Sequence, residues 1–427
     1  MSITKPSLNI TGIPGVTPSI GTFTRASTAT YRSANGTIKT SNSNELRHDY
    51  NPITKEYLGI LIEESRSNIV LQSDTIGSLW TQSNISANTL NAIISPDGTL
   101  GGDLLVEDNT VGQHVSMQTA SGVVSGATIS VSSFFKSKER DKVVLRCSTN
   151  SGTDRFEVLA DIANGVIMSE ATNGTGKIYN SNIEPYANGW YRVSATGVPG
   201  TATNPTIWRM MANNITSNYP GDNASGLYIW GAQLEEHQSG TGNNSSETSY
   251  IPTTGASTVT RSADLWQIST DKFEFDENEG TTFINFTWPR NKESGGSDGS
   301  GLFNFTDVGI TGEIRLRVSD TRIIGETVPG SFSPGFANSA SYPGTIKSIP
   351  PTEDNTKIAM GWKKNEGDLS YNGIATATDT SLDIPPNMTN LFLGNNRNSR
   401  TYLNGHLKQF LYWPKKLTKL EIQELTS

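Results

Sequence analysis

The side chains that could do chemistry are few in this chain, and most are isolated. The histidines His48, His114, His237 and His406 lie far apart, and none belongs to a Gly-x-Ser-x-Gly or His-Glu-x-x-His motif. We interpret each as a surface or hydrogen-bonded structural histidine. Cys147 is the only cysteine, which excludes an intrachain disulfide and a cysteine-based zinc site. We therefore predict that the chain is not an enzyme.

Glu63 and Glu64 are the most conspicuous pair of carboxylates. On a β-strand, two adjacent side chains point to opposite faces, so they cannot share a substrate. We interpret them as structural, with an ion pair from one of them to Arg25 or Arg66. Glycoside hydrolysis by carboxylates that only folding brings together stays open, because no sequence feature selects such a pair.

Sugar recognition is the other chemistry that the residue types allow. It needs aromatic faces for the apolar side of a sugar ring, and planar polar side chains for the hydroxyl groups. The candidate glycan-binding residues, all on expected loops and turns of the C-terminal part, are Tyr342, Tyr371, Asn372, Asn395, Asn396, Arg397 and Asn398. Their structural alternatives are a sheet position for Tyr371, and turns that tolerate positive φ for the Asn-rich loop. No cofactor is expected. Calcium binding stays open without assigned ligands, since no Asp-x-Asp-x-Asp-Gly loop occurs.

The composition indicates that β-strands position these residues. Of 427 residues, 17% are charged, against roughly 25% in a typical soluble domain. Ser, Thr and Asn supply the polarity and suit sheets and turns better than helix interiors. Apolar residues alternate with polar ones, most clearly at Ile314, Leu316 and Val318, and Asn-Gly or Asp-Gly pairs mark turns between such stretches. We predict an all-β fold of tandem antiparallel sandwiches, with Trp190, Trp230, Trp362 and Trp413 in their cores.

One short helix is expected, at the C-terminal end. Thr418 and Glu421 have the spacing of a capping box, and Leu417 and Ile422 have that of a hydrophobic staple. A helix of about two turns must dock on a sheet to persist.

Charge and hydropathy exclude several kinds of partner. The net charge is −8 and no basic stripe occurs, so we expect no nucleic-acid binding. No apolar run approaches the roughly 18 residues that span a bilayer, so no membrane insertion is expected. The stretch Met1 to Thr11 lacks the apolar region of a secretory signal, which predicts synthesis in a cytoplasm.

The length predicts two or three domains. We divide the chain into an extended N-terminal segment at 1–75, a jelly-roll domain at 76–255 and a lectin-like sandwich at 256–427 that folds on its own. Polar stretches at 238–249 and 291–301 read as loops. There is also a faint internal repeat, since the stretch from Thr22 to Ser27 resembles that from Thr258 to Ala263.

Several stretches resemble structural proteins of tailed bacteriophages. The residues that carry this resemblance are Gly21 to Tyr31, Leu58 to Asn68 with Trp80, and Tyr228 to Glu235 followed by Ser249 to Gly255. The last 170 or so residues resemble a concanavalin A-like or laminin-G-like sandwich, through Asp368 to Gly373, Leu391 to Gly394, Asn404 to Leu407 and Leu411 to Thr418.

This resemblance implies a tail or head fibre, or a spike, of a virion. Such a protein is a homotrimer, attaches to other virion proteins through its N-terminal segment, and presents lectin-like domains to a polysaccharide of the host cell surface. Two alternatives stay open, namely a purely structural decoration protein of the capsid or tail and a polysaccharide-degrading tailspike enzyme.

Overall fold

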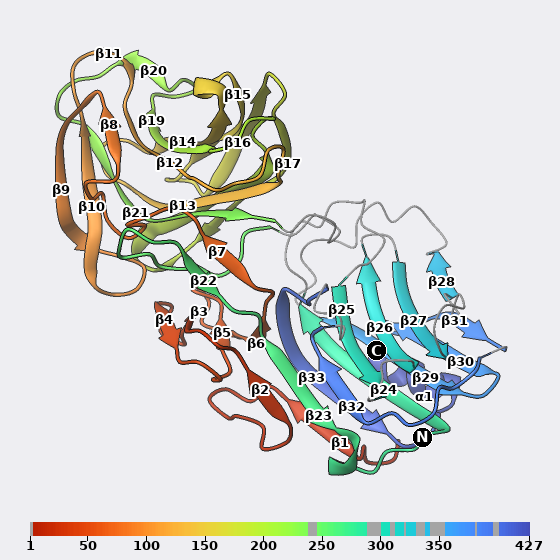
Figure 1. The fold of residues 1–427 in the computed structure, drawn as a ribbon. Helices are drawn as coiled ribbons and strands as arrows, with labels where there is room; N and C mark the ends of the chain where they lie inside the picture. Colours follow the sequence, from red (N-terminus) through yellow and green to blue (C-terminus); the bar gives the residue numbers. More distant parts are fainter. Residues whose placement is uncertain are drawn as a thin grey trace.

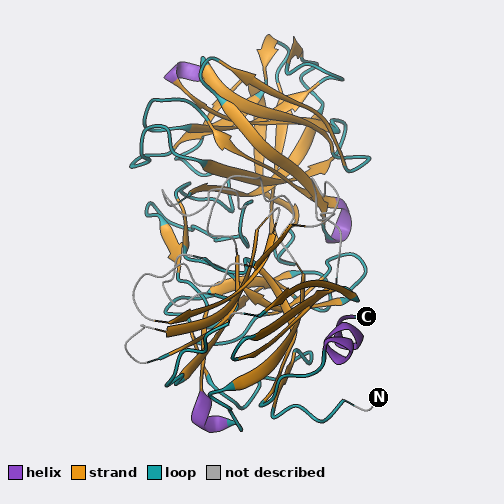
Figure 2. Cartoon of the chain, turned by 90° about the vertical axis from the view of Figure 1, so that its right-hand side faces the viewer, coloured by secondary structure: helices purple, strands orange, loops and turns teal. Residues whose placement is uncertain are grey.

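The computed structural model describes residues 3–237, 246–287, 300–307, 312–319, 322–329, 338–341, 355–380, 382–395 and 401–427. These residues form antiparallel sheets, three single-turn 3-10 helices and one short α-helix, so the predicted all-β fold is confirmed. Two β-sandwiches lie one above the other, with a narrow connection between them (Figure 1; Figure 2). No helix in the described part of the chain is long and apolar enough to cross a membrane.

The inner sandwich is built from residues 81–236. Its first sheet has the order β17 (Lys177–Pro185), β18 (Trp190–Val198), β13 (Ile129–Ser137), β21 (Gly226–Glu236), β10 (Leu100–Glu107) and β9 (Ile85–Ile94). Its second sheet has the order β16 (Val166–Asn173), β15 (Asp154–Asp161), β14 (Lys142–Thr149), β19 (Thr206–Ala212), β12 (Val115–Thr119) and β8 (Thr81–Ser83). Strands β11 (Val111–Gln113) and β20 (Asn218–Pro220) form a small separate ladder. The two six-stranded sheets enclose a core that includes Phe135, Leu145 and Phe156.

The outer sandwich contains both ends of the described chain. One sheet has the order β31 (Ile374–Asp379), β30 (Glu366–Tyr371), β29 (Thr356–Lys363), β24 (Glu279–Thr287), β33 (Gly405–Trp413), β6 (Tyr57–Ile62) and β5 (His48–Tyr50), and β1 (Leu8–Thr11) also pairs with β33. The other sheet has the order β2 (Thr22–Thr24), β23 (Leu265–Ser269), β32 (Asn390–Leu393), β25 (Ser300–Thr306), β26 (Gly312–Ser319), β27 (Arg322–Pro329) and β28 (Asn338–Ser341). Between them lies a core that includes Phe303, Trp362 and Tyr412.

The inner sandwich is an insertion into the outer one. The chain leaves the outer sandwich through β7 (Arg66–Asn68) and returns through β22 (Val259–Arg261), and these two strands pair in an antiparallel ribbon. A hairpin of β3 (Ala29–Arg32) and β4 (Ile38–Ser41) lies beside this ribbon (Figure 1).

This topology differs from the expected division of the chain. Strands β1, β2, β5 and β6, all from the first 75 residues, complete the two sheets of the sandwich that residues 256–427 were expected to form alone. The apolar stretch Leu58 to Ile62 pairs with β33, which provides the partner surface that such a short segment needs.

The alternating patterns place the core as predicted. Ile314, Leu316 and Val318 are buried, and Arg315 and Arg317 between them are partly exposed. The four tryptophans predicted to be core residues, Trp190, Trp230, Trp362 and Trp413, are all buried within strands. The expected turn at Asn372 and Gly373 joins β30 to β31, and both residues have positive φ.

The C-terminal helix α1 (Lys419–Thr426) confirms its predicted cap. Thr418 Oγ1 accepts a hydrogen bond from the backbone N–H of Glu421, and the Glu421 side chain accepts one from the N–H of Thr418. Leu417 and Ile422 are buried in one cluster, so the staple positions also pack together. The helix docks on β29, β30 and β31.

Candidate functional site

A buried ion network lies where the ribbon meets the outer sandwich. Arg47 Nη1 is 2.7 Å from Glu63 Oε2, and Arg25 Nη1 is 3.0 Å from Asp264 Oδ1. Arg47 also pairs with Asp264, and Arg261 pairs with Glu63. All five side chains are nearly inaccessible to solvent. Their mutual pairing indicates a structural role, because a buried charge persists only when it is paired and hydrogen-bonded.

The structural interpretation of the two adjacent glutamates is therefore supported. Glu64 pairs with Arg66, which is one of the predicted ion pairs. Glu63 instead pairs with Arg47 and Arg261, while Arg25 reaches Asp264. The two carboxylates face different partners and do not form one catalytic pair.

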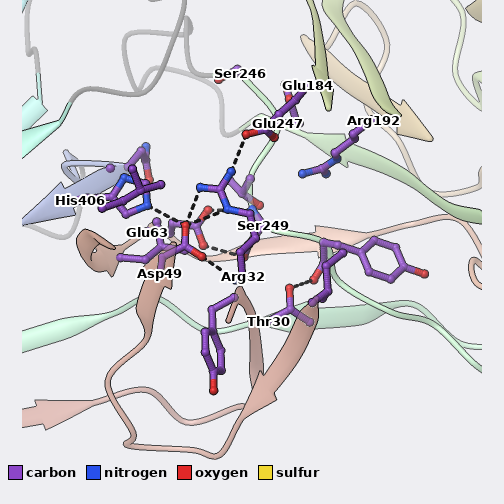
Figure 3. A pocket seen from close by; sticks show the side chains of 18 of the residues that line it. Thr30, Arg32, Asp49, Glu63, Glu184, Arg192, Ser246, Glu247, Ser249 and His406 are labelled. Carbon is purple, nitrogen blue, oxygen red and sulfur yellow. Dashed lines mark hydrogen bonds and ion pairs between the residues drawn. The ribbon is translucent and has the colours of Figure 1, made fainter. Parts of the chain in front are cut away.

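A pocket of about 200 Å³ lies beside this network, at the junction of the two sandwiches (Figure 3). Three parts of the chain line it. The lining residues used below are Tyr31, Arg32, Asp49 and Asn51 from the N-terminal strands, Asn182, Glu184, Tyr186, Arg192 and Glu247 from the inner sandwich and the segment that follows it, and Thr287 and His406 from the outer sandwich.

Arg32 is the central cation of this junction pocket. Its Nε donates to Asp49 Oδ2 at 3.0 Å, and its Nη1 pairs with Glu184 of the inner sandwich. Figure 3 shows the Arg32 guanidinium reaching both a carboxylate below it, from Asp49, and one above it. The Arg32 side chain is 16% exposed and that of Glu184 is 25% exposed, so this ion pair joins the two sandwiches within reach of solvent.

Asp49 also anchors a short hydrogen-bonded chain. Its Oδ2 is 2.8 Å from His406 Nε2, and His406 Nδ1 is 2.9 Å from Thr287 Oγ1. Thr287 and His406 are cross-strand neighbours in β24 and β33, which accounts for their contact. The arrangement fixes the imidazole in the pocket wall, in agreement with the predicted role of a hydrogen-bonded histidine.

The carboxyl groups of the pocket differ in their proton affinity. Burial would raise the pKa of Asp49, but Arg32 and the contact with His406 hold it well below its ordinary value. For Glu247, burial raises the pKa, and the opposing attraction of Arg192 is smaller. Burial also raises the pKa of the Tyr186 phenol. The pKa values of Asp49 and Glu247, in the same pocket wall, are thus shifted in opposite directions.

The predicted glycan-binding residues that the structure describes do not line this pocket. The Tyr371 side chain is buried and belongs to the core of the outer sandwich. Asn372 Oδ1 accepts a hydrogen bond from the Lys357 N–H across the end of β30. Asn395 is buried and forms an isolated bridge with Tyr402. The remaining candidates, Tyr342, Asn396, Arg397 and Asn398, fall outside the described residues.

Within the described ranges, no three His, Cys, Asp or Glu side chains are grouped so that they could hold a metal ion. Calcium binding therefore has no assigned ligands in the described part of the chain.

Sequence reasoning missed the junction pocket because no motif marks it. Its residues come from segments far apart in the chain, and His406 and Glu63 were the only charged members considered beforehand. One signal was present, since the stretches Gly21 to Tyr31, Leu58 to Asn68 and Ser249 to Gly255 stood out as resembling one family, and parts of all three line the pocket.

Comparison with known proteins gives only distant similarities. No family model and no curated protein sequence matches the chain. Among solved structures, domain 4 of the extracellular GH43 arabinanase AbnA from Geobacillus stearothermophilus, in complex with arabinotriose, has a TM-score of 0.30 at 14% identity, covering 39% of this chain and 73% of that one.

Two laminin structures are similar over more of the chain. The LG1-3 region of the laminin alpha2 chain has a TM-score of 0.22 at 11% identity, covering 73% of this chain and 66% of that one. Domains LG4-5 of the mouse laminin alpha1 chain have a TM-score of 0.22 at 7% identity, with coverages of 83% and 88%.

Proposed function

We propose that the chain is a glycan-binding structural protein of a tailed-phage virion, and that the junction pocket holds the sugar. The observation that carries this proposal is the lining of the pocket, which combines tyrosine side chains, amides and ion-paired charges at one partly open site.

These residue types suit a sugar ring. Tyr31 is half-buried and offers an aromatic surface, and Asn51 and Asn182 offer amide groups that both donate and accept hydrogen bonds. Binding sites for small molecules combine such an apolar surface with a few fixed polar groups. Arg32 and Glu184 are already held by their ion pair, which reduces the entropy lost when a ligand binds.

The virion assignment comes from the sequence resemblance. A homotrimer, attachment to other virion proteins and exposure to a host-surface polysaccharide belong to this part of the proposal. The fold adds a constraint on attachment, because β1, β2, β5 and β6 of the N-terminal segment pair within the sheets of the outer sandwich. Virion partners would therefore meet this segment as part of the outer sandwich rather than as a free arm.

Glycan binding is tested with the full chain on an array of oligosaccharides. We expect the wild type to bind at least one oligosaccharide, Asn182→Ala to weaken that binding, and Asn109→Ala, at an exposed position outside the pocket, to leave it unchanged. A full chain that binds no sugar on the array would contradict the proposed function and favour the purely structural alternative.

The virion assignment needs a separate measurement. Antibodies raised against the chain should label purified phage particles at the tail or at the capsid when viewed by electron microscopy. Particles that carry no label, although the infected cells contain the protein, would contradict a virion location. Deletion of the N-terminal 57 residues is unsuitable here, because it would remove strands of the outer sandwich and confuse unfolding with detachment.

A second candidate function is hydrolysis of a polysaccharide. It is favoured by one observation, namely that Asp49 and Glu247 line the same pocket with their pKa values shifted in opposite directions. Glycosidases use such a pair, with the protonated acid donating to the leaving oxygen and the ionised group acting as base or nucleophile. Release of reducing ends by the wild type, abolished in Glu247→Gln, would favour hydrolysis over binding alone.

A further inference from the structure

We infer that the junction pocket selects an uncharged sugar, with Glu247 as a hydrogen-bond acceptor for one of its hydroxyl groups, and rejects acidic sugars. This inference rests on the proposed function, because it names the class of glycan that the same pocket takes. The inference depends on which hydrogen-bond donors and acceptors of the pocket are already bonded to other groups of the protein.

The cationic groups of the pocket are engaged by the protein itself. Arg32 uses Nε and Nη2 on Asp49 and Nη1 on Glu184. Arg192 donates from Nε and Nη2 to Ser132 Oγ, at 3.2 and 2.9 Å. Apart from His406, no other cationic side chain of the described residues lines the pocket. A ligand carboxylate or phosphate would have to break an ion pair of Arg32 to gain that cation. At Arg192 it could approach through Nη1, because the described hydrogen bonds of that side chain use Nε and Nη2.

The acceptors, in contrast, are in surplus. Glu247 Oε2 is buried and accepts no hydrogen bond from the described residues, although Ser194 contacts the same carboxyl group. Figure 3 shows Glu247 near Glu184 and Arg192 on the inner-sandwich side of the pocket. A buried oxygen without a donor costs free energy that a ligand donor could recover. Because Oε2 is buried, a sugar hydroxyl reaches it only after a change of the Glu247 rotamer, and rotamer changes of this kind commonly accompany binding.

Charge repulsion then excludes acidic sugars. Asp49, Glu184 and Glu247 outnumber the arginines Arg32 and Arg192 in the wall of a pocket with restricted access to water, where charges interact more strongly than in bulk solvent. A uronic acid, a sialic acid or a sugar phosphate would add a further anion to this group. A neutral hexose or N-acetylhexosamine adds hydrogen-bond donors without charge.

The test uses the full chain and matched sets of printed oligosaccharides, one neutral and one acidic. The wild type should bind neutral members at least 10-fold more tightly than acidic members of the same length. Glu247→Gln keeps an amide oxygen as acceptor but removes the charge, so it should weaken binding of the neutral members several-fold. Glu277→Gln, at an exposed position outside the pocket, is the matched control and should bind as the wild type does.

A second variant is expected to reduce the preference for neutral over acidic sugars. Glu184→Gln removes one of the two carboxylates that hold Arg32, so its guanidinium gains the capacity to pair with a ligand anion. We expect this variant to lose at least part of the preference and to bind acidic members several-fold more tightly than the wild type does.

The outcomes separate this inference from the proposed function. A wild type that binds acidic members as tightly as neutral ones, or Glu247→Gln that binds neutral members unchanged, overturns the selectivity while glycan binding stands. A wild type that binds neither set contradicts the proposed function itself. Unfolding midpoints of the variants show whether any loss of binding reflects loss of the fold.

Discussion

Arg47 and Glu63 form a buried ion pair, 2.7 Å from Nη1 to Oε2, at the point where the chain leaves the outer sandwich for the inner one. Asp264, at the point of return, pairs with the same arginine. The network therefore ties the outgoing and incoming segments together at the root of the inserted domain. Ser249 adds to it, because its Oγ is 2.7 Å from Glu63 Oε2.

The first prediction concerns this network. Arg47→Met removes the cation that both carboxylates share and leaves them buried with fewer partners. Breaking a buried pair in this way costs about 3–5 kcal/mol of the free energy of unfolding. We expect a clearly lower urea midpoint, measured by tryptophan fluorescence. The control is Lys272→Met, in a surface ion pair with Asp271, which should leave the midpoint unchanged. Equal midpoints for Arg47→Met and the wild type would show that the network contributes little.

The second prediction follows from the proton affinity of Glu63. Burial would raise its pKa, but Arg261 and Arg47 lower it from its ordinary value of 4.5 to about 2. Because the folded pKa is the lower one, the contribution of the ionised form is complete above about pH 4.5 and is lost as the pH falls toward about 2. Wild-type stability should therefore fall over this window.

Glu63→Gln tests this assignment, because it cannot ionise. It should be less stable than the wild type at pH 7, and the difference between the two free energies of unfolding should shrink as the pH falls from 5 to 2. A difference that stays constant across this range would mean that Glu63 does not carry the acid dependence.

The third prediction concerns the C-terminal helix. Thr418→Ala removes the acceptor of the Glu421 N–H and should cost roughly 0.5–2 kcal/mol. Thr418→Ser keeps the hydroxyl and is the matched control, with an expected midpoint close to that of the wild type. The measurement is urea unfolding of the full chain. An equal decrease in the free energy of unfolding in both variants would indicate that Thr418 contributes through packing rather than through capping.

The sequence predicted what depends on local patterns. Alternation of apolar and polar residues predicted the strand of Ile314 and Leu316, and the spacing of Thr418 and Glu421 predicted the helix cap. Each of these two patterns involves residues that are only a few positions apart in the sequence. Pairing between segments that are far apart in the sequence produces no such local pattern. Nothing local indicates that β6 pairs with β33, or that Arg32 meets Glu184 of another sandwich.

The faint internal repeat shows the same limit. The stretches around Arg25 and Arg261 resemble each other. In the structure both arginines end in one ion network, Arg25 on Asp264 and Arg261 on Glu63. A repeated pattern thus marked a shared site, but the sequence could not show that the two copies meet.

The last prediction tests the inserted arrangement by dissection. Arg66 and Arg261 are cross-strand partners in the ribbon, so their backbones lie only about 5 Å apart. Replacing residues 67–260 by a Gly-Gly turn should therefore leave an outer sandwich with all its strands. We expect this variant to be soluble, to show a β-type circular dichroism spectrum and to unfold cooperatively. Residues 256–427 alone lack β1, β2, β5 and β6, which exposes core residues such as Phe410, and should aggregate. If the 256–427 fragment unfolds as cooperatively as the joined variant, the N-terminal strands are dispensable, and the outer sandwich does not depend on both halves of the chain.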